Sequence, residues 1–285
     1  MNSPLKIGNY TVHTLEMGRF ALDGGAMFGV VPKILWQKEN PSDELNRIDM
    51  RTRCLLMQDE KNKRNILVDC GLGDKDSQQF KERFKISPYE LDLALAKFAL
   101  LPENITDVIA THFHFDHMGG LTKFDNDGKL ISRFPKAKIW AQKRNWKHAW
   151  NPNEKDRASY LKDNFAIYDG ESLLELLDGP EEILPGIRVQ ISEGHTVGMQ
   201  HPMVFDNNLS LLYCADIIPM SAHVRVPWVM GYDCFPLTTM EEKKKILQEA
   251  EERETIIFFE HCPHMHGARV RHNGKDYEVK EKIYL

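Results

Sequence analysis

Residues 112–117 carry four side chains that end in an imidazole or a carboxylate, in the order His112, His114, Asp116 and His117. The apolar run Val108–Ala110 comes directly before them, which places them where a buried strand ends and a loop begins. On non-helical backbone these groups can point in different directions, around more than one centre. Imidazole nitrogens and carboxylate oxygens suit zinc and neighbouring transition metals. The pattern therefore predicts a metal site that can hold two ions.

Three further apolar runs lead into the same kinds of side chain. Residues 187–191 precede His195, residues 209–215 precede Asp216, and residues 256–259 precede Glu260 and His261. Any one of these residues alone is more often a structural, hydrogen-bonded residue, and a histidine-rich loop alone can bind metal adventitiously. Ligand sites in α/β sheets gather at the carboxyl ends of strands. The agreement of four strand ends therefore extends the predicted metal site to His195, Asp216 and His261.

Composition narrows the class of protein. The chain has 285 residues, of which 42% are apolar and 28% charged, as in globular proteins that bury a substantial core. A formal net charge of −5 gives no electrostatic footprint for nucleic acid. The N-terminus lacks the basic and apolar regions of a secretory signal, and no apolar run is long enough for a membrane helix. The five cysteines are widely spaced, so a reducing cytoplasm is expected.

Strand-like and helical patterns alternate along most of the chain, which favours an α/β architecture. No repeat or Pro/Gly/Ser-rich linker divides it, so residues 1–285 are expected to form a single domain. The first 60 residues resemble a β-meander, and residues 142–178 are helical and aromatic. Helices are predicted from the capping signals at Ser87–Glu90 and at Thr239–Glu242. Strands are predicted at 66–69, 107–110, 138–141, 187–191, 209–215 and 256–259.

The order of these segments resembles the metallo-β-lactamase superfamily. The resemblance rests on Ile66–Gly71, His112–His117, Gly194–Thr196, Asp216 and His261. It implies a four-layer αβ/βα sandwich with two metals at one edge of the two sheets. The implied ligands of the first metal are His112, His114 and His195; those of the second are Asp116, His117 and His261, with Asp216 bridging both. Asp69 is implied to accept a proton from a ligand imidazole and so to fix its tautomer.

Two segments, Phe20–Pro32 and Trp228–Asp233, resemble the branch of lactonases and methyl-parathion-hydrolase-like enzymes. Two positions depart from that pattern. Residue 199 is Met where many relatives have a second histidine, and residue 219 is Pro where some lactonases carry a catalytic tyrosine. These departures weaken a direct transfer of lactonase specificity. Members of this branch are often homodimers, so a homodimer is an expectation.

The resemblance implies a hydrolase in which a metal-bridging hydroxide attacks small esters, lactones or phosphotriesters. Asp116 and Asp216 are the carboxylates expected to act in catalysis, with Asp116 orienting the hydroxide. Zinc is the default for both ions, and manganese, cobalt or iron suit the same ligands. A nucleic-acid-processing member of the superfamily and a thioesterase of the glyoxalase-II type are the alternatives. The acidic balance disfavours the first, and the absence of an evident helical C-terminal region disfavours the second.

A small-molecule substrate is the expected partner, with neither nucleic acid nor membrane expected. Pockets for small ligands are mostly apolar with a few polar groups. On this basis the predicted pocket residues are Met27, Phe28, Val31, Trp36, Trp146, Trp150, His223, Trp228, Met230 and Tyr232. Taken singly, each aromatic or apolar residue in this set is more often part of a core than of a pocket.

Overall fold

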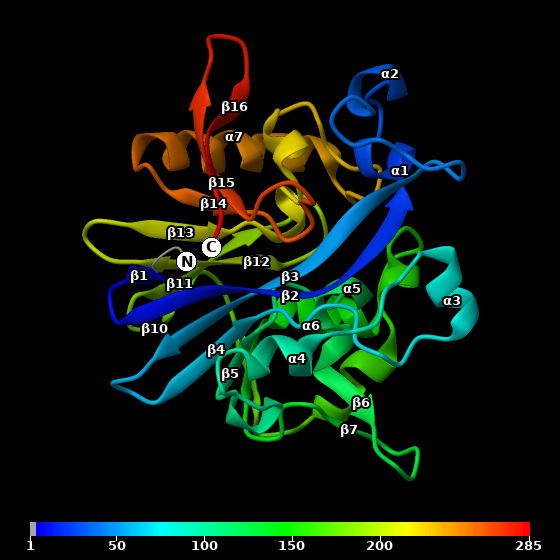
Figure 1. Cartoon of the computed structure of the whole chain (residues 1–285), viewed down its shortest axis with the longest axis vertical. Helices are drawn as coiled ribbons and strands as arrows, with labels where there is room; N and C mark the ends of the chain where they lie inside the picture. The colour runs from blue at the N-terminus through cyan, green and yellow to red at the C-terminus, as the bar shows by residue number, and fades with distance from the viewer. Residues whose placement is uncertain (1–3) are drawn as a thin grey trace.

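A computed structural model describes residues 4–285 as two seven-stranded sheets and a small hairpin (Figure 1). The first sheet contains, in spatial order, β1 (Leu5–Ile7), β2 (Tyr10–Asp23), β3 (Arg47–Asp59), β4 (Arg64–Val68), β5 (Asp107–Ile109), β8 (Lys138–Gln142) and β9 (Leu174–Leu177). Its first four strands pair antiparallel, whereas β4, β5, β8 and β9 run parallel. The expected N-terminal meander and α/β pattern are therefore both present.

The second sheet is built from the C-terminal half of the chain. In spatial order it contains β10 (Glu181–Leu184), β11 (Ile187–Ser192), β12 (Met199–Phe205), β13 (Ser210–Tyr213), β14 (Ile256–Phe258), β15 (Gly267–His272) and β16 (Tyr277–Ile283). Only β13 and β14 pair in parallel. The remaining pair, β6 (Thr122–Phe124) and β7 (Leu130–Ser132), forms a separate hairpin.

Helices cover the outer faces of the sheets, which confirms the αβ/βα layering. On the first sheet, α4 (Leu91–Ala96) contacts β2 and α6 (Lys143–Trp150) contacts β8 and β9, while α7 (Pro236–Glu252) lies against β15 of the second sheet. The shorter helices are α1 (Gly24–Phe28), α2 (Lys33–Trp36), α3 (Gln78–Arg83) and α5 (Phe115–Met118). The 3-10 turns are η1 (Pro102–Asn104), η2 (Gly119–Leu121), η3 (Arg157–Ser159), η4 (Lys162–Asn164), η5 (Ala166–Tyr168), η6 (Ala215–Ile217) and η7 (Ser221–Val224).

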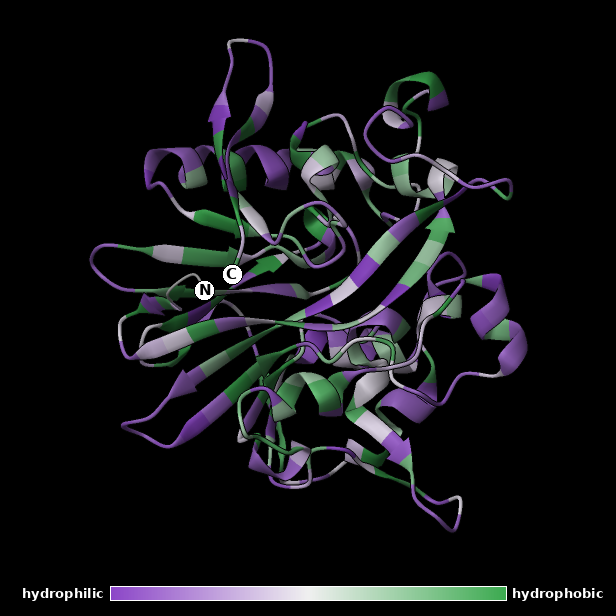
Figure 2. Cartoon of the chain, viewed as in Figure 1, coloured by the Kyte–Doolittle hydropathy of each residue, from purple (hydrophilic) through white to green (hydrophobic). Residues whose placement is uncertain are grey.

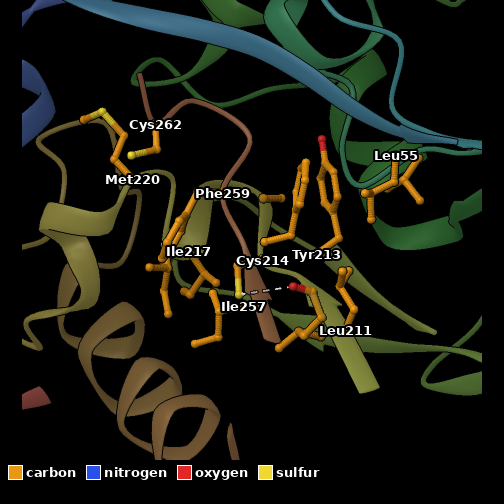
Figure 3. Packing of buried hydrophobic residues seen from close by; sticks show 14 of the residues in the cluster. Leu55, Leu211, Tyr213, Cys214, Ile217, Met220, Ile257, Phe259 and Cys262 are labelled. Carbon is orange, nitrogen blue, oxygen red and sulfur yellow. Dashed lines mark hydrogen bonds between the residues drawn. The ribbon is translucent and has the colours of Figure 1, made fainter. Parts of the chain in front are cut away.

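Two apolar cores follow from this layering. One lies between the sheets and beneath α7, and the other lies between the first sheet and helices α4 and α6. Figure 2 shows apolar strands inside and polar residues along the outer side of α7. In Figure 3, Tyr213 and Ile257 pack in the first core, and the Tyr213 hydroxyl donates a hydrogen bond across the layers to the carbonyl of Arg53 on β3, at 3.0 Å.

Both predicted helix starts are misplaced, by a few residues each. The chain from Ser87 to Glu90 is held against β2 instead, because the backbone amides of Ser87 and Glu90 donate to the carbonyls of Arg19 and Met17. The Ser87 hydroxyl accepts the amide of Arg19 and so caps no helix. Helix α7 begins three residues before the predicted Thr239, at Pro236, where proline is favoured because a first-turn amide needs no partner.

Among residues 4–285, no helix combines the length and the apolar character needed to cross a membrane.

Candidate metal centre and active site

The predicted site residues lie at the carboxyl ends of strands from both sheets. Strand β5 runs parallel to β4 and leads to His112, and β13 runs parallel to β14, leading to Asp216 and His261 respectively. Parallel neighbours place their carboxyl ends at the same edge of a sheet, so these side chains meet there. His195 follows β11, and Asp116 and His117 lie in α5. The seven predicted ligands are therefore brought together and are all buried.

The seven residues form two donor groups. The first group is His112, His114, His195 and Asp216, whose nearest nitrogen or oxygen atoms all lie within 4.8 Å of one another. Within it, Nδ1 of His114 is 3.0 Å from Nε2 of His112 and 3.2 Å from Nε2 of His195. The same His195 nitrogen is 3.2 Å from Oδ2 of Asp216.

The second donor group is Asp116, His117, Asp216 and His261. Nε2 of His261 is 3.4 Å from Nε2 of His117 and 3.2 Å from Oδ1 of Asp216. The Asp116 carboxylate completes this group, at 3.8 Å from His261 and 3.9 Å from His117. Asp216 therefore offers one oxygen to each group, which is the arrangement of a bridging carboxylate.

These separations fit bound metal ions better than a hydrogen-bond network. Zinc–nitrogen bonds of about 2.0–2.1 Å in tetrahedral geometry place ligand atoms about 3.3 Å apart. The separations among His112, His114 and His195 are 3.0 and 3.2 Å. One nitrogen, Nδ1 of His114, faces two imidazole nitrogens at once, and it cannot form a good hydrogen bond with both. The donor set therefore fits two divalent cations of the zinc class.

Four of the five ligand histidines are held by a hydrogen bond at their second ring nitrogen. Nδ1 of His112 lies 3.0 Å from the hydroxyl of Thr111, Nδ1 of His195 lies 3.0 Å from Asp233, and Nδ1 of His261 lies 2.8 Å from the carbonyl of Arg51. Such partners fix the tautomer and orientation of a metal-binding imidazole. The second nitrogen of His114, Nε2, is buried without a partner among the described residues.

The fourth histidine, His117, faces two carboxylates. Its Nδ1 atom is 3.0 Å from Asp69 and 2.9 Å from Glu260. A contact between Asp69 and a ligand imidazole is what the family resemblance implies. Asp69 also accepts hydrogen bonds from the amide and hydroxyl of Thr111. It therefore links Thr111, which directly precedes the motif, to His117 at the end of the motif. The carboxylate of Glu260 is fully buried and lies against this imidazole.

Charge is distributed unevenly between the donor groups. Burial, followed by the neighbouring imidazoles, holds the pKa of His112 and that of His114 well below the usual value, so both rings are neutral and ready to act as ligands. Burial has the same tendency at His261, yet Glu260 and Asp216 outweigh it and raise its pKa to about 9. The second group therefore carries more buried negative charge, which a bound cation would offset.

The backbone around the motif is tightly constrained. A side chain at Gly119 or Gly120 would collide with backbone, because a Cβ atom would lie 1.9 Å from the carbonyl oxygen of Leu72 or 2.2 Å from that of Cys70. Asp69 and Ala215 adopt positive φ angles of 58° and 45°, which non-glycine residues rarely do. Such conformations persist where the surrounding structure imposes them. Here they direct Asp69 and Asp216 into the site.

A pocket of about 290 Å³ opens over the donor groups and is lined by His114, Asp116, His195, Asp216 and His261. Its remaining wall is largely apolar. That part of the lining consists of Leu22, Met27, Met50, Phe80, Phe84, Phe115, Ala158 and Met230, with the polar residues Arg83, Lys155, Asp156, Ser159 and Tyr232. The predicted pocket residues Met27, Met230 and Tyr232 are therefore at this surface.

The other predicted pocket residues do not line this cavity, which corrects the sequence-based prediction. Phe28 is fully buried and stacks between Trp36 and His223, with ring centroids 5.2 and 4.8 Å away, and Trp228 meets it edge-on. Nε2 of His223 donates to the carbonyl of Met27 at 2.8 Å. This aromatic cluster supports the segment that carries Met27. Val31, Trp146 and Trp150 are likewise absent from the lining.

Sequence reasoning missed several residues that the fold brings to the site. Glu260 precedes His261 directly at a strand end, so its position was a usable signal. Asp233 lies in a loop 38 residues after its partner His195, and the segment Trp228–Asp233, which it ends, gave no indication of this contact. Phe80, Arg83 and Phe84 reach the pocket from α3 and the turn that follows it, which only the tertiary structure reveals.

The chain matches the sequence profile of the metallo-β-lactamase superfamily over residues 49–279 and belongs to that superfamily. An N-acyl homoserine lactonase of Bacillus cereus is 23% identical over 231 residues, which cover 76% of this chain and 83% of the relative. The family match and the lactonase relatives identify the protein as a metal-dependent hydrolase. They also agree with the predicted resemblance to the lactonase-like branch.

Solved structures are similar over almost the whole chain, including the two that follow. A probable metal-dependent hydrolase from Staphylococcus aureus is 30% identical, with a TM-score of 0.87 over 98% of this chain and 100% of that one. AidC, a dizinc quorum-quenching lactonase, is 19% identical, with a TM-score of 0.81 over 99% and 98% of the two chains. At that identity the second likeness shows the shared fold.

Proposed function

We propose that the protein hydrolyses small lactones, esters or phosphotriesters, with lactones that carry an apolar acyl chain as the first candidates. The observation that carries this proposal is the carboxylate of Asp216, which is shared by two donor groups at the floor of a pocket with a largely apolar wall. The curated relatives named N-acyl homoserine lactonase support the lactone class. A pocket of about 290 Å³ suits a small molecule better than a nucleic-acid strand.

The proposed cofactor is a pair of divalent ions, with zinc as the default and manganese, cobalt or iron as alternatives. When bound, such ions lower the pKa of water towards about 7 and polarise a carbonyl or phosphoryl oxygen. The first donor group would hold one ion and the second group the other. Thr111, Asp233 and the carbonyl of Arg51 keep the ligand imidazoles oriented for this task.

The remaining pocket groups have distinct proposed roles. Asp116 lines the cavity and would accept a hydrogen bond from the attacking water or hydroxide, which orients that nucleophile towards the substrate. Tyr232 contributes an O–H donor, because burial raises the pKa of its phenol to about 12 and its hydroxyl makes no hydrogen bond within residues 4–285. It therefore can donate to the substrate's carbonyl or leaving oxygen. Phe80, Phe84 and Met50 supply the apolar contact surface for the acyl part.

A hydrolysis panel tests this proposal. Acyl-homoserine lactones, δ-lactones, p-nitrophenyl esters and a dialkyl aryl phosphotriester would each be offered to metal-stripped protein and to the same protein reloaded with zinc or manganese. We expect turnover that depends on metal, with a preference for longer acyl chains over shorter ones. An inactive panel from protein that holds two ions per chain would refute the substrate class. Thioesters and nucleic acid would then be tested.

A further inference from the structure

A second cluster of charged residues lies on strands β2 and β3, apart from the pocket. In the register of these antiparallel strands, Arg19 lies directly opposite Arg51, and Glu16 lies opposite Arg53. A bulge between Glu16 and Gly18 separates the two pairs. Like charges directly opposite one another destabilise a sheet, whereas opposite charges stabilise it. The Glu16–Arg53 pair is therefore favourable, and the Arg19–Arg51 pair is not.

The environments of these arginines differ accordingly. Arg53 is 2% exposed, and its guanidinium is paired with the Glu16 carboxylate and donates to the carbonyl of Met265 at 3.2 Å. The guanidinium groups of Arg19 and Arg51 have no carboxylate within 4.0 Å and no hydrogen-bond acceptor among residues 4–285. Burial, and then the charge of Arg19, lowers the pKa of Arg51 below its usual value, as expected for uncompensated positive charge.

Arg19 and Arg51 both line a surface hollow of about 560 Å³. The hollow shares no residue with the pocket over the metal centre. Its lining residues are Glu16, Gly18, Arg19, Arg51, Arg53, Ser87, Glu90, Pro263 and His266. The Glu16 charge is neutralised by Arg53, and Glu90 is exposed and has no ion pair within the described residues. The chain has 42 acidic residues and 37 basic ones, so the absence of a partner for Arg19 and Arg51 is not a shortage of carboxylates.

We propose that this hollow binds a small anion through a phosphate group held between the side chains of Arg19 and Arg51. Guanidinium groups match the geometry of phosphate oxygens and form charge-assisted, often bidentate, hydrogen bonds with them. A dianion neutralises both charges and turns an unfavourable cross-strand pair into a favourable site. The shared chemistry is the phosphate group, and its source is either free phosphate or a small phosphomonoester for which the hollow has room.

Titration calorimetry on the metal-loaded full chain tests this site. The probes are inorganic phosphate and 5′-AMP, each added at constant ionic strength, with Arg19→Gln/Arg51→Gln as the test variant. Arg253→Gln is the control, because Arg253 is exposed, as Arg19 is, and makes no ion pair within the described chain. We expect the double variant to bind the better probe at least tenfold more weakly than the wild type, and the control to bind it equally well. Tighter binding of 5′-AMP would identify a phosphomonoester, and equal or tighter binding of inorganic phosphate would identify the free ion.

Thermal unfolding separates a binding role from a structural one. In chloride buffer the double variant should be at least as stable as the wild type, because it has lost a like-charge pair. The better probe should raise the Tm of the wild type and leave that of the double variant unchanged. Equal binding by the two proteins would place the anion elsewhere, for example at the metal centre, and would overturn the proposal. Absence of binding by the wild type, or a double variant that is less stable in chloride, would also overturn it.

Discussion

Buried histidines occupy two regions of this molecule, and the two groups differ in what their ring nitrogens face. At the sheet edge, His195 and His261 each lie 3.2 Å from the carboxylate of Asp216, and each also faces another ligand imidazole, that of His114 or His117 respectively. Away from that edge, His201 lies within β12 at 1% exposure, and His223 donates to a backbone carbonyl under a stacked phenylalanine ring. Both groups are therefore buried, but only the histidines at the sheet edge gather around a shared carboxylate.

This difference has a measurable consequence for charge. Burial lowers the pKa of His201 to about 4 and that of His223 to about 3, so both are neutral, packed side chains. At His261 the nearby carboxylates outweigh burial and raise the pKa. A buried histidine surrounded by carboxylates implies an additional cation, either a proton or a metal ion. A buried histidine whose ring nitrogens face neither a carboxylate nor another imidazole, as at His201 and His223, implies a structural role.

The largest expected effect comes from the shared carboxylate. Asp216→Asn removes the negative charge common to both donor groups, so metal content should fall below two ions per chain. Turnover should fall by on the order of 10³-fold or more, because metal-activated water is lost. Metal analysis and kcat/KM for the best panel substrate measure both. His201→Leu is the matched control from the other group, and an equal loss of metal in that variant would erase the distinction between the groups.

The second prediction concerns pH and the histidine that lies within a strand. The folded pKa of His201, about 4, is below its unfolded value of about 6.5, so the unfolded state binds its proton first as the pH falls. The free energy of unfolding should therefore decline from pH 6.5 to about 4, with a contribution from His201 of up to about 3 kcal/mol. In urea titrations, His201→Leu should show a correspondingly shallower decline. A parallel pH profile in the two proteins would contradict this.

The third prediction compares carboxylates behind the two donor groups. Glu260→Gln and Asp233→Asn each remove a charge that faces the outer nitrogen of one ligand histidine, His117 or His195 respectively. Loss of such a partner weakens metal binding by about 10- to 100-fold. We expect each variant to bind one of its two ions more weakly, as measured by chelator competition. If both variants released both ions together, the two groups would not be separable units.

The smallest effect is expected from the pocket hydroxyl. Tyr232→Phe removes one neutral hydrogen-bond donor and keeps the ring, so kcat/KM should fall by about two- to tenfold, with metal content unchanged. His223→Phe serves as a comparison, because His223 does not line the pocket. Its expected cost falls on stability, since the buried carbonyl of Met27 loses its donor. Unchanged kcat/KM in Tyr232→Phe would remove Tyr232 from the proposed chemistry.

The metal-binding motif and the strand ends were predictable because a strand's end and its ligand are adjacent in sequence. The strands leading to His112, Asp216 and His261 agree with the structure to within one or two residues. The residues that form hydrogen bonds with the ligand histidines were harder to predict, because a residue such as Asp233 meets His195 only in the tertiary structure. The aromatic residues Phe28 and Trp36 misled the prediction, because the composition of an apolar pocket wall resembles that of a core.

Helix starts were misplaced for a comparable reason. Ser87 has the side chain of a helix cap, yet its amide donates to the carbonyl of Arg19 on β2 and its hydroxyl accepts the amide of Arg19. Local propensity yields where tertiary hydrogen bonds compete with it. The pairing of Arg19 with Arg51 was likewise not predictable, because it becomes visible only when the register of β2 and β3 is known.

Metal stoichiometry tests the central claim most directly, namely that two donor groups share Asp216. Metal-stripped wild-type protein, titrated with zinc and followed by calorimetry and metal analysis, should bind two ions per chain. His261→Ala should bind one ion tightly, because it leaves His112, His114, His195 and Asp216 intact. A wild type that binds one ion, or a His261→Ala variant that still binds two with wild-type affinity, would contradict the account.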